Sequence, residues 1–148
     1  GENYLQNITN NYIIIRTEWL YGKNGKNFGR TILEKARTTN KLEVVDDQIG
    51  SPTYTKDLVV AVSLLIERNI KGIFHITNRG SCSWFQFTEK ILQEAGIFGV
   101  QVLPIKSDSL GRPAKRPHYS VLSMQKFIEA TGKIMQPWQL ALQDYLHK

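Results

Sequence analysis

The sequence predicts a mixed α/β fold built as one unit over residues 1–148. Short apolar runs rich in β-branched residues alternate with segments that have helical spacing, which is typical of this class. No segment repeats another, and no linker rich in proline, glycine or serine divides the chain. Hydrophobic residues at 41% and charged residues at 22% are typical of a globular domain and exclude a disordered or collagen-like chain.

Four apolar runs bounded by turn formers are predicted to be strands. They cover residues 12–15, 42–45, 73–77 and 100–105. The first is a continuous apolar run, which indicates a parallel strand buried on both faces. His75 lies inside the third run, so we expect it to be a buried core histidine.

Two helices have clear N-terminal signals. Asn27 is expected to cap a helix whose apolar face contains Phe28. Ser83 and Gln86 form a capping box, and the helix that they begin is expected to stop at Gly96.

Three further helices follow from spacing. One begins at Thr55 or Asp57 and is apolar nearly all round, so we expect it to be buried between other elements. Ser123 is expected to cap a short helix. Pro137 suits the first position of a last helix, whose apolar face carries Trp138, Ala141, Leu142, Tyr145 and Leu146.

Two long polar loops hold the best candidates for a site, because structureless segments of that length in a compact domain are usually functional or disordered. In residues 46–53, Gln48, Ser51 and Thr53 with the backbone of Gly50 suit a phosphate or a carbohydrate hydroxyl. The same residues also suit a simple turn with local hydrogen bonds, and both interpretations stay open.

In the second loop, residues 107–119, Lys115 and Arg116 lie between Pro113 and Pro117. The fixed φ angles of the prolines could preset a guanidinium for bidentate binding to phosphate, or the two cations could form a solvated pair. Trp19 and Tyr21 follow the end of the first strand, where open α/β sheets bind ligands. They could stack on a sugar or base, or anchor the core.

The net charge of +6 favours anionic partners, but the basic residues are dispersed and only Arg112, Lys115 and Arg116 cluster, so we do not expect nucleic acid binding. No apolar run is long enough for a membrane span and no signal peptide is visible, so we expect a cytoplasmic protein without membrane contact. The single cysteine, Cys82, excludes an internal disulfide. No metal site, catalytic constellation or phosphate-binding glycine motif is present, so no catalytic residue is predicted.

Five blocks of the chain carry a resemblance to a known family. They resemble, in order and spacing, the C-terminal half of dTDP-4-dehydrorhamnose reductase, a member of the extended short-chain dehydrogenases. The blocks are residues 16–22, 25–28, 44–54, 80–84 and 113–117, the last followed by residues 120–122. The resemblance implies the last strands of a Rossmann-type sheet plus a small mixed α/β substrate-binding region.

By this resemblance, the chain is the sugar-nucleotide-binding portion of an NADPH-dependent enzyme that reduces a 4-keto group in dTDP-L-rhamnose synthesis. The family's glycine fingerprint and its Tyr-x-x-x-Lys pair are absent from the chain. In the family a Gly-Glu follows that lysine closely, so Gly1-Glu2 resembles a start just downstream. We therefore expect the chain alone to be inactive. The alternative is a non-catalytic nucleotide-sugar-binding or regulatory module, like the beta subunit of methionine adenosyltransferase.

The resemblance also implies roles for single residues. Trp19 would face the sugar, Arg116 would meet the diphosphate, and Thr17 and Glu18 would lie on the cofactor side. Glu18 stands where family members commonly have a small residue. A homodimer and a magnesium ion occur in some members and are possible here. The other implied contacts to the dTDP-sugar come from Tyr21, Asn27, Phe28, Gln48, Gly50, Ser51, Pro52 and Thr53.

Overall fold

The computed structural model describes residues 1–111 and 113–147; Arg112, which belongs to the basic cluster noted above, lies outside the described residues. The fold is mixed α/β, as the sequence predicts. The helices are α1 Glu2–Ile8, α2 Phe28–Ala36, α3 Thr55–Glu67, α4 Trp84–Glu94, α5 Gln125–Thr131 and α6 Trp138–His147, with a 3-10 turn at Ser107–Leu110. The strands are β1 Ile13–Arg16, β2 Leu20–Tyr21, β3 Lys41–Val45, β4 Ile49–Gly50, β5 Thr53–Tyr54, β6 Gly72–His75, β7 Cys82–Ser83 and β8 Gln101–Ile105.

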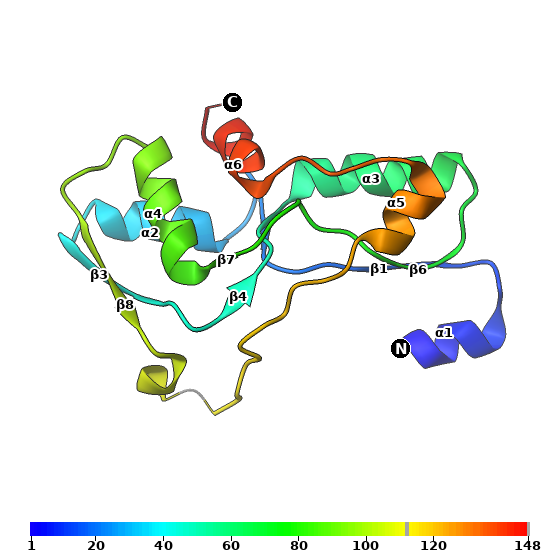
Figure 1. Cartoon of the computed structure of the whole chain (residues 1–148), viewed down its shortest axis with the longest axis horizontal. Coiled ribbons are helices and arrows are strands. Elements are labelled where there is room, and N and C mark those ends of the chain that lie inside the picture. The colour runs from blue at the N-terminus through cyan, green and yellow to red at the C-terminus, as the bar shows by residue number, and fades with distance from the viewer. Residues whose placement is uncertain (112, 148) are drawn as a thin grey trace.

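The elements gather in two groups, which Figure 1 shows side by side. In one group the parallel pair of β3 and β8 lies with α2 and α4. In the other, the parallel pair of β1 and β6 lies with α3 and α5. Two short pairs, parallel β2 with β5 and antiparallel β4 with β7, lie between the groups. The chain therefore crosses repeatedly between the groups, and its loops meet there.

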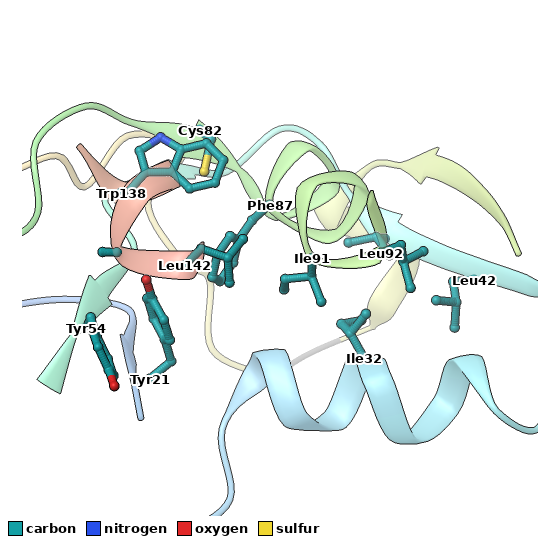
Figure 2. Close-up of a cluster of buried hydrophobic side chains, with 12 residues drawn as sticks. Tyr21, Ile32, Leu42, Tyr54, Cys82, Phe87, Ile91, Leu92, Trp138 and Leu142 are labelled. Carbon is teal, nitrogen blue, oxygen red and sulfur yellow. The ribbon is translucent and has the colours of Figure 1, made fainter. Parts of the chain in front are cut away.

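Each group has its own hydrophobic core. The core around α4 is rich in aromatic rings, and Figure 2 shows how Phe87 and Ile91 point from α4 toward Leu142 of α6 and Ile32 of α2. A fully buried side chain of this size contributes about 1.5–3 kcal/mol by leaving water. The second core consists of Ala61, Leu65, Phe74, Ile76, Phe127 and Met135.

The strongest sequence signals for helix ends are confirmed. The Asn27 side chain accepts a hydrogen bond from the backbone N–H of Arg30 and begins α2. Ser83 and Gln86 form the capping box of α4, and Gly96 follows the helix with φ of 67°. Because both caps are local, the nearby sequence is enough to specify them.

The burial predicted for two whole elements, α3 and β1, is wrong. Only Ala61 and Leu65 of α3 are buried, whereas Val59, Val60 and Ile66 are 48–62% exposed. Residues 13–15 of β1 are only half-buried, because β6 is the one partner of β1 among the described strands. An element is buried on both faces only when other elements pack on both of its sides. The periodicity of the sequence does not show how many elements do so.

Several local expectations are also corrected. The segment 46–53 is not wholly a loop, because residues 49 and 50 pair with β7 and Thr53 pairs with β2. α5 has Met124 at its N-cap position, with Ser123 one residue earlier, and Pro137 stands just before α6. His75 is half-buried at the end of β6 rather than enclosed in the core.

Candidate functional site

A cavity of about 440 Å³ opens between α2, β3 and the start of α4. Phe28 and Trp84 supply aromatic walls, and Thr31, Lys35 and Glu43 supply polar groups. Gln48 and Arg116 reach it from the two loops that the sequence singles out. Apolar walls with a few convergent polar groups are the usual make-up of a small-molecule site.

Two smaller cavities adjoin this one through shared residues. A cavity of about 320 Å³ is lined by Glu18, Trp19, Gln48, Trp84, Arg116, Pro117 and Ser120. A polar cavity of about 240 Å³ is lined by Gln48, Ser107, Asp108, Gly111, Ala114, Lys115, Arg116 and His118. Gln48 and Arg116 line all three cavities. We call the three the aromatic cavity, the Trp19 cavity and the polar cavity.

Two tryptophans line the Trp19 cavity, and one of them, Trp84, also lines the aromatic cavity. The rings of Trp19 and Trp84 stack with centroids 3.5 Å apart and planes 9° apart. Trp19 has φ of 46°, a left-handed conformation that is unusual for a bulky residue. Its ring lies against Gly50, where a Cβ would be 2.4 Å from a ring carbon. The glycine is therefore required by the position of the indole.

Three carboxylates fix the loops around the cavities. Asp47 accepts hydrogen bonds from the backbone N–H of Ser107, at 2.9 Å, and from its hydroxyl, at 3.1 Å. Asp46 accepts from the hydroxyl of Ser83, the cap of α4. Glu18 accepts from the backbone N–H of Ser51 at 2.8 Å and from the hydroxyl of Ser120. Burial raises the pKa of Glu18, and these two hydrogen bonds oppose that rise.

Arg116 is the cation that all three cavities share. It is exposed, and within the described part of the chain it makes no hydrogen bond or ion pair. A guanidinium in that state keeps its five donors available for a planar anion. Lys115 and His118 line only the polar cavity, and His118 Nδ1 lies 2.9 Å from the backbone oxygen of Asp47. The site therefore combines aromatic walls with a cationic junction.

Comparison with known proteins adds the family. A family model described as the RmlD substrate binding domain matches residues 1–148. The chain belongs to the RmlD substrate-binding domain family. Relatives of the domain include the spore coat polysaccharide biosynthesis protein SpsK of Bacillus subtilis, which is 43% identical over 148 residues, 100% of this chain and 51% of that protein. The dTDP-4-dehydrorhamnose reductase of Mycolicibacterium smegmatis is 38% identical over 133 residues, 88% of this chain and 41% of that protein.

Solved structures show the same fold for the domain. The dTDP-4-dehydrorhamnose reductase of Bacillus anthracis in complex with NADP matches with a TM-score of 0.93 at 39% identity, over 99% of this chain and 52% of that one. The reductase of Clostridium acetobutylicum also has a TM-score of 0.93, at 40% identity, over 99% of this chain and 51% of that one. The fold is thus the substrate-binding part of an extended short-chain dehydrogenase. The chain spans about half the length of the relatives it matches.

The structure brings together Glu18, Trp19, Phe28, Gln48 and Arg116 from the expected site residues of the domain. It does not bring Tyr21 to a cavity. Tyr21 is 2% exposed and packs on the rings of Tyr54, Phe87 and Tyr145, so it anchors the core. Trp19 lines a cavity and also packs against the core, so its contact with the sugar stays a prediction, whereas Tyr21 lies in the core.

Most of the other expected residues have structural roles in the domain. Asn27 uses its side chain for the α2 cap and donates to the backbone oxygen of Gly22 at 2.8 Å. Pro52 and Thr53 are buried, and the Thr53 hydroxyl donates to the backbone oxygen of Ser51. Ser51 lines a different cavity, of about 250 Å³, beside Asn78 and Leu122. Thr17 lines none of the cavities described here.

Sequence reasoning missed Trp84, Ser120 and the polar side chains of α2 and β3. Trp84 falls at helical spacing with Phe87 and Ile91, so it is easily assigned to the core face of α4. Its place at the first position of α4, directly after the cap Ser83, is the signal, because that end of a helix adjoins the preceding loop. Thr31, Lys35 and Glu43 carry no local signal, because only the approach of α2 to β3 places them at one cavity.

Among residues 1–111 and 113–147, no helix is long and apolar enough to cross a membrane. Nor does any group of three or more His, Cys, Asp or Glu in that part of the chain suit a metal ion.

Proposed function

We propose that the chain is the sugar-nucleotide-binding portion of an NADPH-dependent dTDP-4-dehydrorhamnose reductase, which reduces the 4-keto group of its substrate in dTDP-L-rhamnose synthesis. The observation that carries the proposal is the position of Arg116 at the junction of three cavities of different character. A sugar nucleotide has the same order of parts: a flat base, a diphosphate and a polar ring. The relatives named as reductases support this function, and none of them supports a regulatory module.

The aromatic cavity suits the nucleoside. Phe28 and Trp84 offer rings on which a base can stack, with their centroids 4.4 Å apart and planes at 46°. Thr31, Lys35 and Glu43 can donate to and accept from the polar edge of a pyrimidine. A dTDP moiety therefore finds both apolar area and hydrogen-bonding partners here.

The diphosphate belongs at Arg116. A guanidinium binds phosphate oxygens bidentately, and Lys115 and His118 add positive or hydrogen-bonding groups from the polar cavity. The Trp19 cavity then takes the sugar, since Gln48 and Ser120 provide amide and hydroxyl groups beside the indoles. In this arrangement the chain holds and orients the substrate, which lowers the barrier by positioning.

On the cofactor side we propose a role for Thr17 alone. Its hydroxyl oxygen is buried and has no hydrogen-bonding partner within the described residues, a property that it shares with the hydroxyl of Tyr21, so the proposal rests on the family resemblance. Glu18 fits less well, because both of its oxygens already accept bonds from the protein. NADPH, when bound, supplies the hydride. Magnesium gains no support from the described residues.

Isothermal titration of the chain with dTDP tests the proposal. Arg116→Ala is expected to weaken binding by about 1.5–3 kcal/mol, the worth of a charge-assisted hydrogen bond, and Arg116→Lys to recover only part of it. Arg37→Ala, which removes the same charge at an exposed position beside Leu33 and Glu94, is the control and should bind normally. Unchanged affinity in Arg116→Ala would refute the diphosphate role.

A further inference from the structure

We propose that Glu18 is a positioning residue for the sugar end of the site, and that it acts by fastening two loop segments to the end of β1. The inference rests on the proposed function, because it assumes that the Trp19 cavity receives the sugar. Glu18 lies two residues after the last residue of β1, next to Trp19 in the sequence. Its side chain lines the Trp19 cavity together with the segments that it holds.

The bonds of Glu18 reach residues far away in the chain. Oε1 accepts from the backbone N–H of Ser51, 33 residues on, and Oε2 accepts from the hydroxyl of Ser120, 102 residues on. Gln48 and Pro117, which belong to the same two segments, also line the cavity. One carboxylate thus joins three walls of a single cavity.

Backbone hydrogen bonds hold the two segments to each other, and the N–H of Thr53 donates to the oxygen of Trp19 at 3.1 Å, which holds the first segment beside Glu18. The N–H of Ser120 donates to the oxygen of Ile49 at 2.9 Å, and the N–H of Ile49 donates to the oxygen of His118 at 2.7 Å. Without the carboxylate these segments keep their mutual pairing and the bond from Thr53 to Trp19, and they lose the two bonds that hold Ser51 and Ser120 to Glu18. We therefore expect the walls of the Trp19 cavity to be held less firmly in a chain that still folds.

The side chain pays a burial penalty to do this. Glu18 is half-buried, and burial is the largest influence on its pKa, which is raised. A carboxylate kept in such a place needs donors, and Ser51 and Ser120 supply them.

The test compares dTDP-L-rhamnose with dTDP as calorimetric probes of the full chain. Glu18→Ala should weaken dTDP-L-rhamnose at least about tenfold and dTDP less than about twofold, because only the sugar meets the disturbed wall. Glu18→Gln should bind within about threefold of the original chain, since its amide can accept from Ser51 and donate to Ser120. Glu34→Ala, which removes an exposed carboxylate from α2, is the matched control and should change neither.

A double-mutant cycle with Ser120→Ala makes the test specific. If Glu18 acts partly through Ser120, the loss in the double variant should be smaller than the sum of the losses in Glu18→Ala and Ser120→Ala. Full additivity, equal weakening of both probes or normal binding by Glu18→Ala would overturn the inference. If Glu18→Ala does not fold, Ser120→Ala alone tests the inference, because it removes one of the two bonds of Glu18 and leaves the carboxylate in place.

Failure of the proposed function is distinguishable. If the original chain binds neither probe, the proposed function falls, and hydrogen exchange in the ligand-free chain still decides the role of Glu18. The N–H of Ser51 should then exchange faster in Glu18→Ala than in Glu34→Ala, and the near-ultraviolet circular dichroism of the stacked tryptophans should change. Identical exchange and spectra in the two variants would overturn the positioning role.

Discussion

Gly50→Ala is the sharpest perturbation that the structure offers. An added Cβ would lie 2.4 Å from Cε2, 2.6 Å from Nε1 and 2.7 Å from Cζ2 of Trp19. Ordinary carbon contacts lie near 3.5–4.0 Å, so the overlap with the nearest ring atom exceeds about 1 Å. The ring of Trp19 already stacks on Trp84, and any shift that relieves the overlap changes that stacking.

Overpacking of this kind costs about 1–3 kcal/mol. The φ of Gly50 is not in the left-handed region, so alanine meets no backbone strain, and the loss comes from the clash alone. Urea unfolding should show a lower midpoint with an unchanged slope, and near-ultraviolet circular dichroism should report the altered tryptophan stack.

Gly99→Ala is the matched control, because a Cβ there meets no atom within 4 Å. It should leave the stability within about 0.5 kcal/mol of the original chain. A Gly50→Ala variant with the original midpoint and spectrum would refute the packing argument.

Three other outcomes are expected. Ser83→Ala, which removes the cap of α4 and the contact with Asp46, should lower the free energy of unfolding by about 1–2 kcal/mol, whereas the exposed Ser81→Ala should not. Burial raises the pKa of Cys82 to about 12, so at pH 8 its thiol stays protonated, and a thiol reagent should label it at least about 100-fold more slowly in the folded chain than in urea. The chain alone should not oxidise NADPH with dTDP-4-dehydrorhamnose, because it lacks the Tyr-x-x-x-Lys pair and the glycine fingerprint; turnover like that of an intact reductase would contradict this.

The sequence was informative where the physical cause is local. The capping box of Ser83 and Gln86 needs only four residues, and the cap at Asn27 is equally short-range. Arg116, which lines the three cavities, could be named as a candidate from the sequence because two prolines and a basic pair mark an unusual loop, and its binding to the diphosphate stays a prediction. These signals require no knowledge of which segments meet.

The errors occur where the cause is long-range. The strands β4 and β5 have only two residues each, and their partners lie elsewhere in the chain, so the segment 46–53 reads as a loop. Tyr21 and Trp19 have the same aromatic character two residues apart, yet one lies in the core and the other lines a cavity. The exposed face of α3 shows that apolar composition alone does not decide burial.

The strand pairing described above has a consequence for the speed of folding. No pairing among the described strands joins consecutive strands, since β1 pairs with β6, β2 with β5, β3 with β8 and β4 with β7. Each ladder must close a long loop before its hydrogen bonds can offset the loss of chain entropy. Topologies of this kind are among the slower two-state folders. Helix α4 can form early, because its capping bonds come from neighbouring residues in the chain. The binding cavities exist only after the non-local ladders have closed.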